Sequence, residues 1–70
     1  DAYDYYVKAF RASNNSYSTP KYLYKAAMLG AELGKNSSAI KYFKRIKKEF
    51  PEVSEAQLVD VQIGRIENIK

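Results

Sequence analysis

Seventy residues, 46% of them hydrophobic, with a formal net charge of +4, suffice for one small folded domain. A chain of this length buries only about 60% of the surface that its unfolded form exposes, so every buried side chain matters. The sequence has no cysteine and no histidine, which excludes disulfides, thiol and imidazole catalysis and the usual zinc sites. We therefore expect a protein that is not an enzyme and needs no cofactor or metal.

The first segment, residues 1–13, is predicted to form a helix with an unusually wide apolar surface. Its charged residues share a narrow arc of the helical wheel, and apolar residues fill the rest. A helix this apolar needs neighbours on more than one side. Because the helical pattern starts at Asp1 with no cap region before it, we expect the sequence to be a fragment of a longer chain.

Turn and cap residues fill positions 14–19, and Pro20 suits the first turn of a second helix, where its missing N–H is not needed. This helix is predicted over residues 19–33, and Gly34 is expected to end it in a left-handed C-cap. Its predicted packing side comprises Tyr22, Leu23, Ala26, Ala27, Leu29, Gly30 and Leu33.

A third helix is predicted to begin after Asn36 or Ser37, either of which can cap it, and to stop at Phe50 because Pro51 cannot continue it. Its apolar face comprises Ala39, Ile40, Tyr42, Phe43, Ile46 and Phe50. Its opposite face, here called the basic face, comprises Lys41, Lys44, Arg45 and Lys48. Such a face could contact the phosphates of nucleic acid or anionic lipid. Exposed charge runs mostly serve solubility, so we expect the basic face to be solvated and anion binding to be a weak third option.

A fourth helix is predicted from Ser54 or Glu55 to residue 70. Its packing side comprises Ala56, Val59, Ile63 and Ile66, and Gly64 is expected to allow a neighbour to approach closely. Leu58, Val61 and Ile69 lie elsewhere on the wheel. The apolar excess on the first and fourth helices could support self-association, because a large exposed apolar patch usually marks an interface.

The two halves of the sequence are similar to each other. A shift of 37 residues aligns Ala2, Tyr5, Tyr6 and Ala9 with Ala39, Tyr42, Phe43 and Ile46, and it aligns Tyr22, Ala26, Ala27 and Leu29 with Val59, Ile63, Gly64 and Ile66. Apolar matches at a fixed period, with short loops between helices, indicate a helical solenoid whose units bury their faces against one another.

The segment AAMLGAELGKNSSAIKYFKRIKKEFP resembles a tetratricopeptide repeat. The matching positions are the small pair Ala26-Ala27, the inter-helix Gly34, the small Ala39 where two helices cross, the aromatic Phe43 and the closing Pro51. Close packing of paired helices explains this set, because small residues must occupy the crossing and a ring must fill the space beside it. The sequence departs from the family at Leu23, Gly30 and Ile46, and its period exceeds the family's usual length of about 34 residues.

This resemblance implies an all-α, antiparallel helix-turn-helix solenoid. Residues 1–13 would be helix B of one repeat, 20–51 a complete repeat and 54–70 helix A of the next. More loosely, the chain is similar to the C-terminal repeats of bacterial tetratricopeptide proteins that an N-terminal helix anchors to the cell envelope, which favours the envelope over the cytoplasm.

The function implied by the resemblance is that of a non-catalytic scaffold for protein–protein interaction, without a small-molecule substrate. Helix A lines the concave surface in this family, and the residues that it would present here are Lys21, Tyr24, Lys25, Met28, Leu58, Val61, Gln62 and Arg65. These would suit an extended or helical peptide with hydrophobic and acidic side chains. The alternative is a structural segment that caps or extends a longer solenoid or associates with itself.

Overall fold

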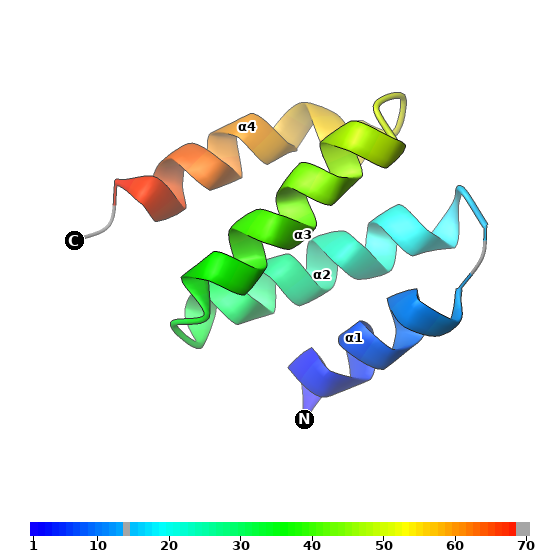
Figure 1. Ribbon diagram of the computed structural model, residues 1–70, viewed down its shortest axis with the longest axis horizontal. Coiled ribbons are helices and arrows are strands. Elements are labelled where there is room, and N and C mark those ends of the chain that lie inside the picture. Colours follow the sequence, from blue (N-terminus) through cyan, green and yellow to red (C-terminus); the bar gives the residue numbers. More distant parts are fainter. Residues whose placement is uncertain (14, 69–70) are drawn as a thin grey trace.

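The described part of the computed structural model, residues 1–13 and 15–68, consists of four α-helices (Figure 1). They are α1 (Ala2–Ala12), α2 (Ser18–Glu32), α3 (Asn36–Glu49) and α4 (Ser54–Glu67). Successive helices run in opposite directions and pack against each other, and α2 also contacts α4. The predicted all-α architecture is confirmed. Ile69 and residue 70, which the sequence placed in the fourth helix, lie outside the described residues.

Side-chain caps fix the start of α1 and the turn before α2. The carboxylate of Asp1 accepts a hydrogen bond of 2.8 Å from the backbone N–H of Asp4, so Asp1 is itself the N-cap of α1. The side chain of Asn15 accepts hydrogen bonds from the backbone N–H groups of Tyr17, at 3.0 Å, and of Ser18. The predicted turn chemistry is thus confirmed at Asn15, but the N-cap of α2 is Tyr17, which makes no side-chain cap hydrogen bond. Asn14 lies outside the described residues.

A tight turn joins α2 to α3 at Gly34. Its φ of +83° is the left-handed conformation that glycine adopts without steric cost. The N–H of Lys35 donates to the carbonyl of Gly30 at 2.8 Å, and the N–H of Gly34 donates to that of Ala31 at 3.2 Å, which is the hydrogen-bond pattern of a Schellman C-cap. The predicted glycine cap is confirmed.

The predicted start of α3 is wrong in its detail. Asn36 is already helical, and the N-cap is Lys35, which makes no side-chain cap hydrogen bond. The reason is that the turn at Gly34 ends at Lys35, whose N–H donates to the carbonyl of Gly30, and α3 begins at the next residue. Asn36 is therefore inside the helix and cannot be its cap. The end of α3 is close to the prediction, because Phe50 is non-helical and precedes Pro51.

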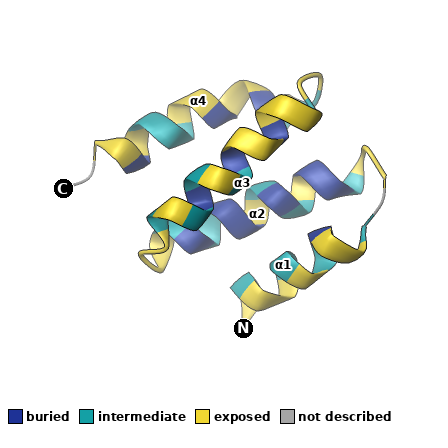
Figure 2. Cartoon of the chain, in the orientation of Figure 1, coloured by how far each residue is buried: buried dark blue, intermediate teal, exposed yellow. Residues whose placement is uncertain are grey.

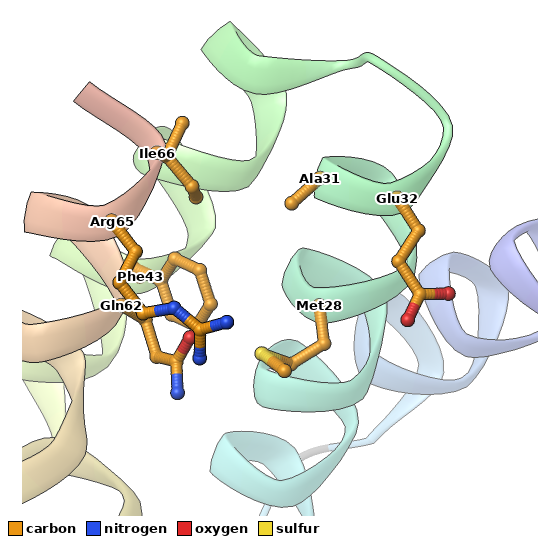
Figure 3. Close-up of a pocket in the computed structure, with 7 residues that line it drawn as sticks. All are labelled: Met28, Ala31, Glu32, Phe43, Gln62, Arg65 and Ile66. Atoms are coloured by element: carbon orange, nitrogen blue, oxygen red, sulfur yellow. The ribbon is translucent and has the colours of Figure 1, made fainter. Parts of the chain in front are cut away.

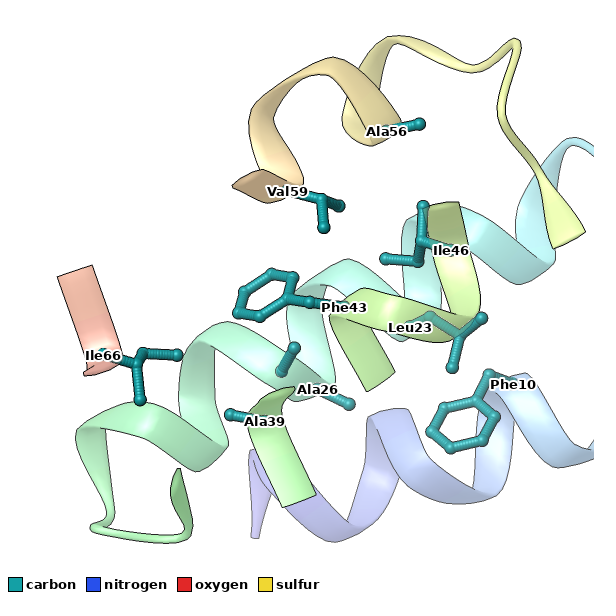
Figure 4. Packing of buried hydrophobic residues seen from close by; sticks show 10 residues of the cluster. Phe10, Leu23, Ala26, Ala39, Phe43, Ile46, Ala56, Val59 and Ile66 are labelled. Atoms are coloured by element: carbon teal, nitrogen blue, oxygen red, sulfur yellow. The ribbon is translucent and has the colours of Figure 1, made fainter. Parts of the chain in front are cut away.

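The core lies where α2, α3 and α4 meet, and α1 adds Phe10 at its edge (Figures 2 and 4). Phe43 is fully buried in it, and so are the small residues Ala26, Ala27 and Ala39, which the sequence assigned to the packing faces. Small side chains in a core let neighbouring helices approach closely.

Two expectations about packing are wrong. Leu33 is 57% exposed, because α2 ends at Glu32 and Leu33 is the C-cap, where the chain leaves the packing side of the helix. Gly64 has no heavy atom within 4 Å of the place where a Cβ would stand, because no helix of the described chain covers that side of α4. The close approach occurs at Gly30 instead, where a Cβ would lie 3.1 Å from Cε1 of Tyr3.

Candidate functional site

The eight residues predicted to line a concave surface lie on α2 and α4, and none of them is buried. Lys21, Tyr24, Lys25 and Met28 follow one another along α2, and Leu58, Val61, Gln62 and Arg65 do so along α4. Spacings of three and four residues place each set on one side of its helix. The two helices contact each other directly, which brings part of each set together.

A groove between α2 and α4 has a volume of about 250 Å³ and is the strongest candidate site (Figure 3). Its lining residues are Met28, Ala31, Glu32, Phe43, Gln62, Arg65 and Ile66. Figure 3 shows Gln62 and Arg65 projecting from α4 toward Met28 on α2, with Phe43 of α3 between the two walls. We call this hollow the α2–α4 groove. It combines an apolar interior with one cation and one carboxylate at its margins.

The structure divides the predicted surface into separate parts. Only Met28, Gln62 and Arg65 of the eight residues line the α2–α4 groove. Leu58 and Val61, which are 50% and 60% exposed, lie outside it.

The remaining predicted residues of α2 lie in two other hollows. Tyr24 and Lys25 line a second hollow of about 430 Å³ between α1 and α2, which we call the α1–α2 groove. Lys21 lies in a third hollow beside the α3–α4 turn, with its ammonium 4.7 Å from the ring centroid of Tyr17. This division arises because α1 and α4 both contact α2, so some residues of α2 line a hollow with α1 and others line a hollow with α4.

Sequence reasoning missed Ala31 and Glu32 and assigned Phe43 and Ile66 to the core alone. Ala31 and Glu32 follow Met28 by three and four residues, so helical spacing was a signal that could have found them. Phe43 is buried and also borders the groove, and its ring packs edge-on at 5.5 Å from that of Tyr24. Tyr24 is therefore a partly exposed residue that also packs against Phe43 beneath the α2–α4 groove.

The basic face of α3 is exposed, as predicted. Arg45 forms an ion pair of 3.2 Å with Glu49, and its guanidinium lies 5.8 Å from the ring centroid of Phe10. Lys47, beside the basic face, bonds the carboxylate of Asp60 on α4 at 2.8 Å. Both ion pairs are largely exposed, so each adds little to stability.

The pKa of Tyr42 departs from its ordinary value. Burial raises the pKa of Tyr42, the nearby Tyr3 hydroxyl raises it further, and Arg11 opposes the shift. The ring of Tyr42 packs edge-on against Phe10 at 5.0 Å, between α1 and α3. The Tyr42 phenol is therefore protonated at neutral pH, and its ring contributes to the packing of α1 against α3.

None of the described helices is both long and apolar enough to cross a membrane. Within residues 1–13 and 15–68, no cluster of three or more acidic side chains could hold a metal ion. Comparisons with models of protein families, with curated proteins and with solved structures find no match for this chain.

Proposed function

We propose that this chain is a tetratricopeptide-like helical scaffold, without catalytic activity, that binds a peptide segment of another protein in the α2–α4 groove. In this proposal residues 20–51 are one complete repeat, flanked by helix B of a preceding repeat and helix A of a following one. The observation that carries it is the groove itself, which is lined by three of the residues that the tetratricopeptide resemblance predicted.

The chemistry of the groove supports a partner with one apolar anchor and a carboxylate. Met28, Phe43 and Ile66 offer an apolar interior, and a volume of about 250 Å³ fits one or two side chains. Arg65 stands at the margin and makes no ion pair with another described residue, so its planar fork of N–H groups can donate hydrogen bonds to a carboxylate of the partner. The pattern of contacts, with each helix on the next and α2 on α4, is what a solenoid of antiparallel helix pairs requires.

Two synthetic amphipathic peptides would test this function, one built from leucine and glutamate and the other with lysine in place of each glutamate. In amide NMR spectra of the chain, we expect the acidic peptide to shift the signals of Met28, Gln62 and Arg65 and the basic peptide to leave them unchanged. Binding should be weak, because the groove is much smaller than a standard interface of about 800 Å² per partner.

The variant Arg65→Glu should lose the acidic peptide, whereas Lys48→Glu on the basic face makes the same charge change outside the groove and should retain it. If Arg65→Glu binds as well as the original chain, or if the shifts gather on the basic face, the groove assignment is wrong. Binding of neither peptide at about millimolar concentration would contradict the proposed function.

A further inference from the structure

Gln62 places a side-chain amide in the wall of the α2–α4 groove (Figure 3). The residue is half-buried, and its side chain makes no hydrogen bond with another described residue. Its amide is open to water, because no buried side-chain nitrogen or oxygen of the described residues lacks a partner. The amide oxygen accepts and the amide nitrogen donates hydrogen bonds, so Gln62 offers a ligand one partner for an N–H and one for a C=O. The backbone of a peptide carries this same pair of groups.

The α2–α4 groove is short along its helices. Its walls comprise only residues 28–32 of α2 and 62–66 of α4, which at about 1.5 Å per residue is a length of about 6 Å. An extended chain, at roughly 3.3 Å per residue, crosses this length with about two residues. An α-helix with its side chains is about 10–12 Å across, so the helix itself stays outside the hollow and only one of its side chains can enter.

The conformation of the ligand backbone decides whether the Gln62 amide keeps a hydrogen-bond partner. In an extended segment the N–H and C=O groups are free to pair with Gln62 while a neighbouring side chain enters the apolar interior. In an α-helix these groups are bonded within the helix. A helical ligand would therefore cover the amide and displace its water without replacing the lost hydrogen bonds, which weakens binding by about tenfold.

We infer, on the basis of the proposed function, that the α2–α4 groove binds an extended segment of the partner and that Gln62 selects this conformation by hydrogen bonding to the partner's backbone. The segment carries one apolar side chain, which packs over Phe43, and a carboxylate within reach of Arg65. Gln62 and Arg65 are three residues apart on α4, so they lie on the same side of the helix and act on the same short stretch of the ligand.

Two peptides with the same anchoring side chains and different backbones test this selection. One is an unstructured pentapeptide with leucine at its centre and glutamate on both sides. The other carries leucine and glutamate on an alanine helix that a covalent staple locks, and circular dichroism checks both conformations. Titrations followed by the amide NMR signals of Met28 and Arg65 should show about tenfold tighter binding of the extended peptide.

Gln62→Met removes the amide and keeps the length of the side chain, so it should weaken the extended peptide about tenfold and abolish its advantage over the helix. Gln57→Met is the matched control, because Gln57 is exposed on the same helix and lies outside the groove, and it should keep the advantage.

A third peptide leaves the protein unchanged and so does not depend on the folding of a variant. It has ester oxygens in place of the two backbone N–H groups nearest to the leucine, and it should bind the original chain about tenfold more weakly than the amide peptide does. Gln62→Met should bind the ester and the amide peptides equally, because their difference arises from the hydrogen bond to Gln62.

Several outcomes would overturn the role of Gln62 and leave the proposed function standing, as long as a peptide shifts the signals of the groove. They are equal or tighter binding of the helix, a Gln62→Met variant that keeps the preference, a Gln57→Met variant that loses it, and an ester peptide that binds like the amide. If no peptide shifts these signals at about millimolar concentration, the proposed function and the role of Gln62 fail together.

Discussion

Replacing Phe43 by alanine probes the residue on which both the core and the α2–α4 groove depend. Its side chain is fully buried, packs edge-on against Tyr24 and forms part of the groove lining. Truncation of a buried phenylalanine to alanine costs about 3–5 kcal/mol, through lost transfer free energy and the cavity left behind. The new cavity would open into the groove, so water can enter it, and we place the cost near 3 kcal/mol.

This cost is large for so small a chain. At about 0.05–0.15 kcal/mol per residue, 70 residues give a free energy of unfolding of roughly 4–10 kcal/mol. Phe43→Ala should therefore remove roughly 30–75% of the free energy of unfolding. Phe43→Leu, which keeps most of the volume, should cost about 1 kcal/mol.

Urea denaturation followed by circular dichroism at 222 nm measures these differences. Tyr17→Ala is the matched control, because it also removes a ring but from a side chain that is 72% exposed, and it should cost less than about 1 kcal/mol. If Phe43→Ala loses no more than Tyr17→Ala does, the assignment of Phe43 to the centre of the packing is refuted.

Three further perturbations test separate features. Gly34→Ala forces an L side chain into a φ of +83° and should lower the free energy of unfolding by about 1–2 kcal/mol. Gly64→Ala adds a methyl group in open space on a helix and should raise the free energy of unfolding by up to about 1 kcal/mol. Equal melting temperatures of the two variants would refute this contrast. Because the folded pKa of Tyr42 is raised, its contribution to stability is complete below the unfolded pKa of about 10 and is lost as pH rises through the folded value. Absorbance at 295 nm, which follows tyrosine ionisation, should show that Tyr42→Phe removes a step above pH 10, and an unchanged titration curve would contradict the assignment. Lys47→Ala should lower the free energy of unfolding by at most about 1 kcal/mol, because the side chains of Lys47 and Asp60 are 57% and 68% exposed, and the loss should shrink at high salt. A larger loss that does not change with salt would contradict the view that this exposed ion pair adds little to stability.

The amino-acid sequence alone predicted the four helices and most of their buried faces. A helix of period 3.6 records in its own residues which side is apolar, so Ala39, Phe43 and Ile46 could be placed in the core from their spacing. Gly34 and Pro51 likewise act on the backbone at their own positions, and the turns at both sites occur where these residues predicted them. The cap of α3 was less predictable, because the tightness of the preceding turn decided which residue became the N-cap.

Only the tertiary structure decided which side chains line a groove between two helices and which remain exposed to solvent. The division of the predicted concave surface into separate hollows, the contribution of Phe43 to the α2–α4 groove and the exposure of Leu33 all depend on where helices distant in sequence lie relative to one another. Local periodicity fixes which way a side chain points from its own helix, but a groove is a property of two helices and of the distance between them.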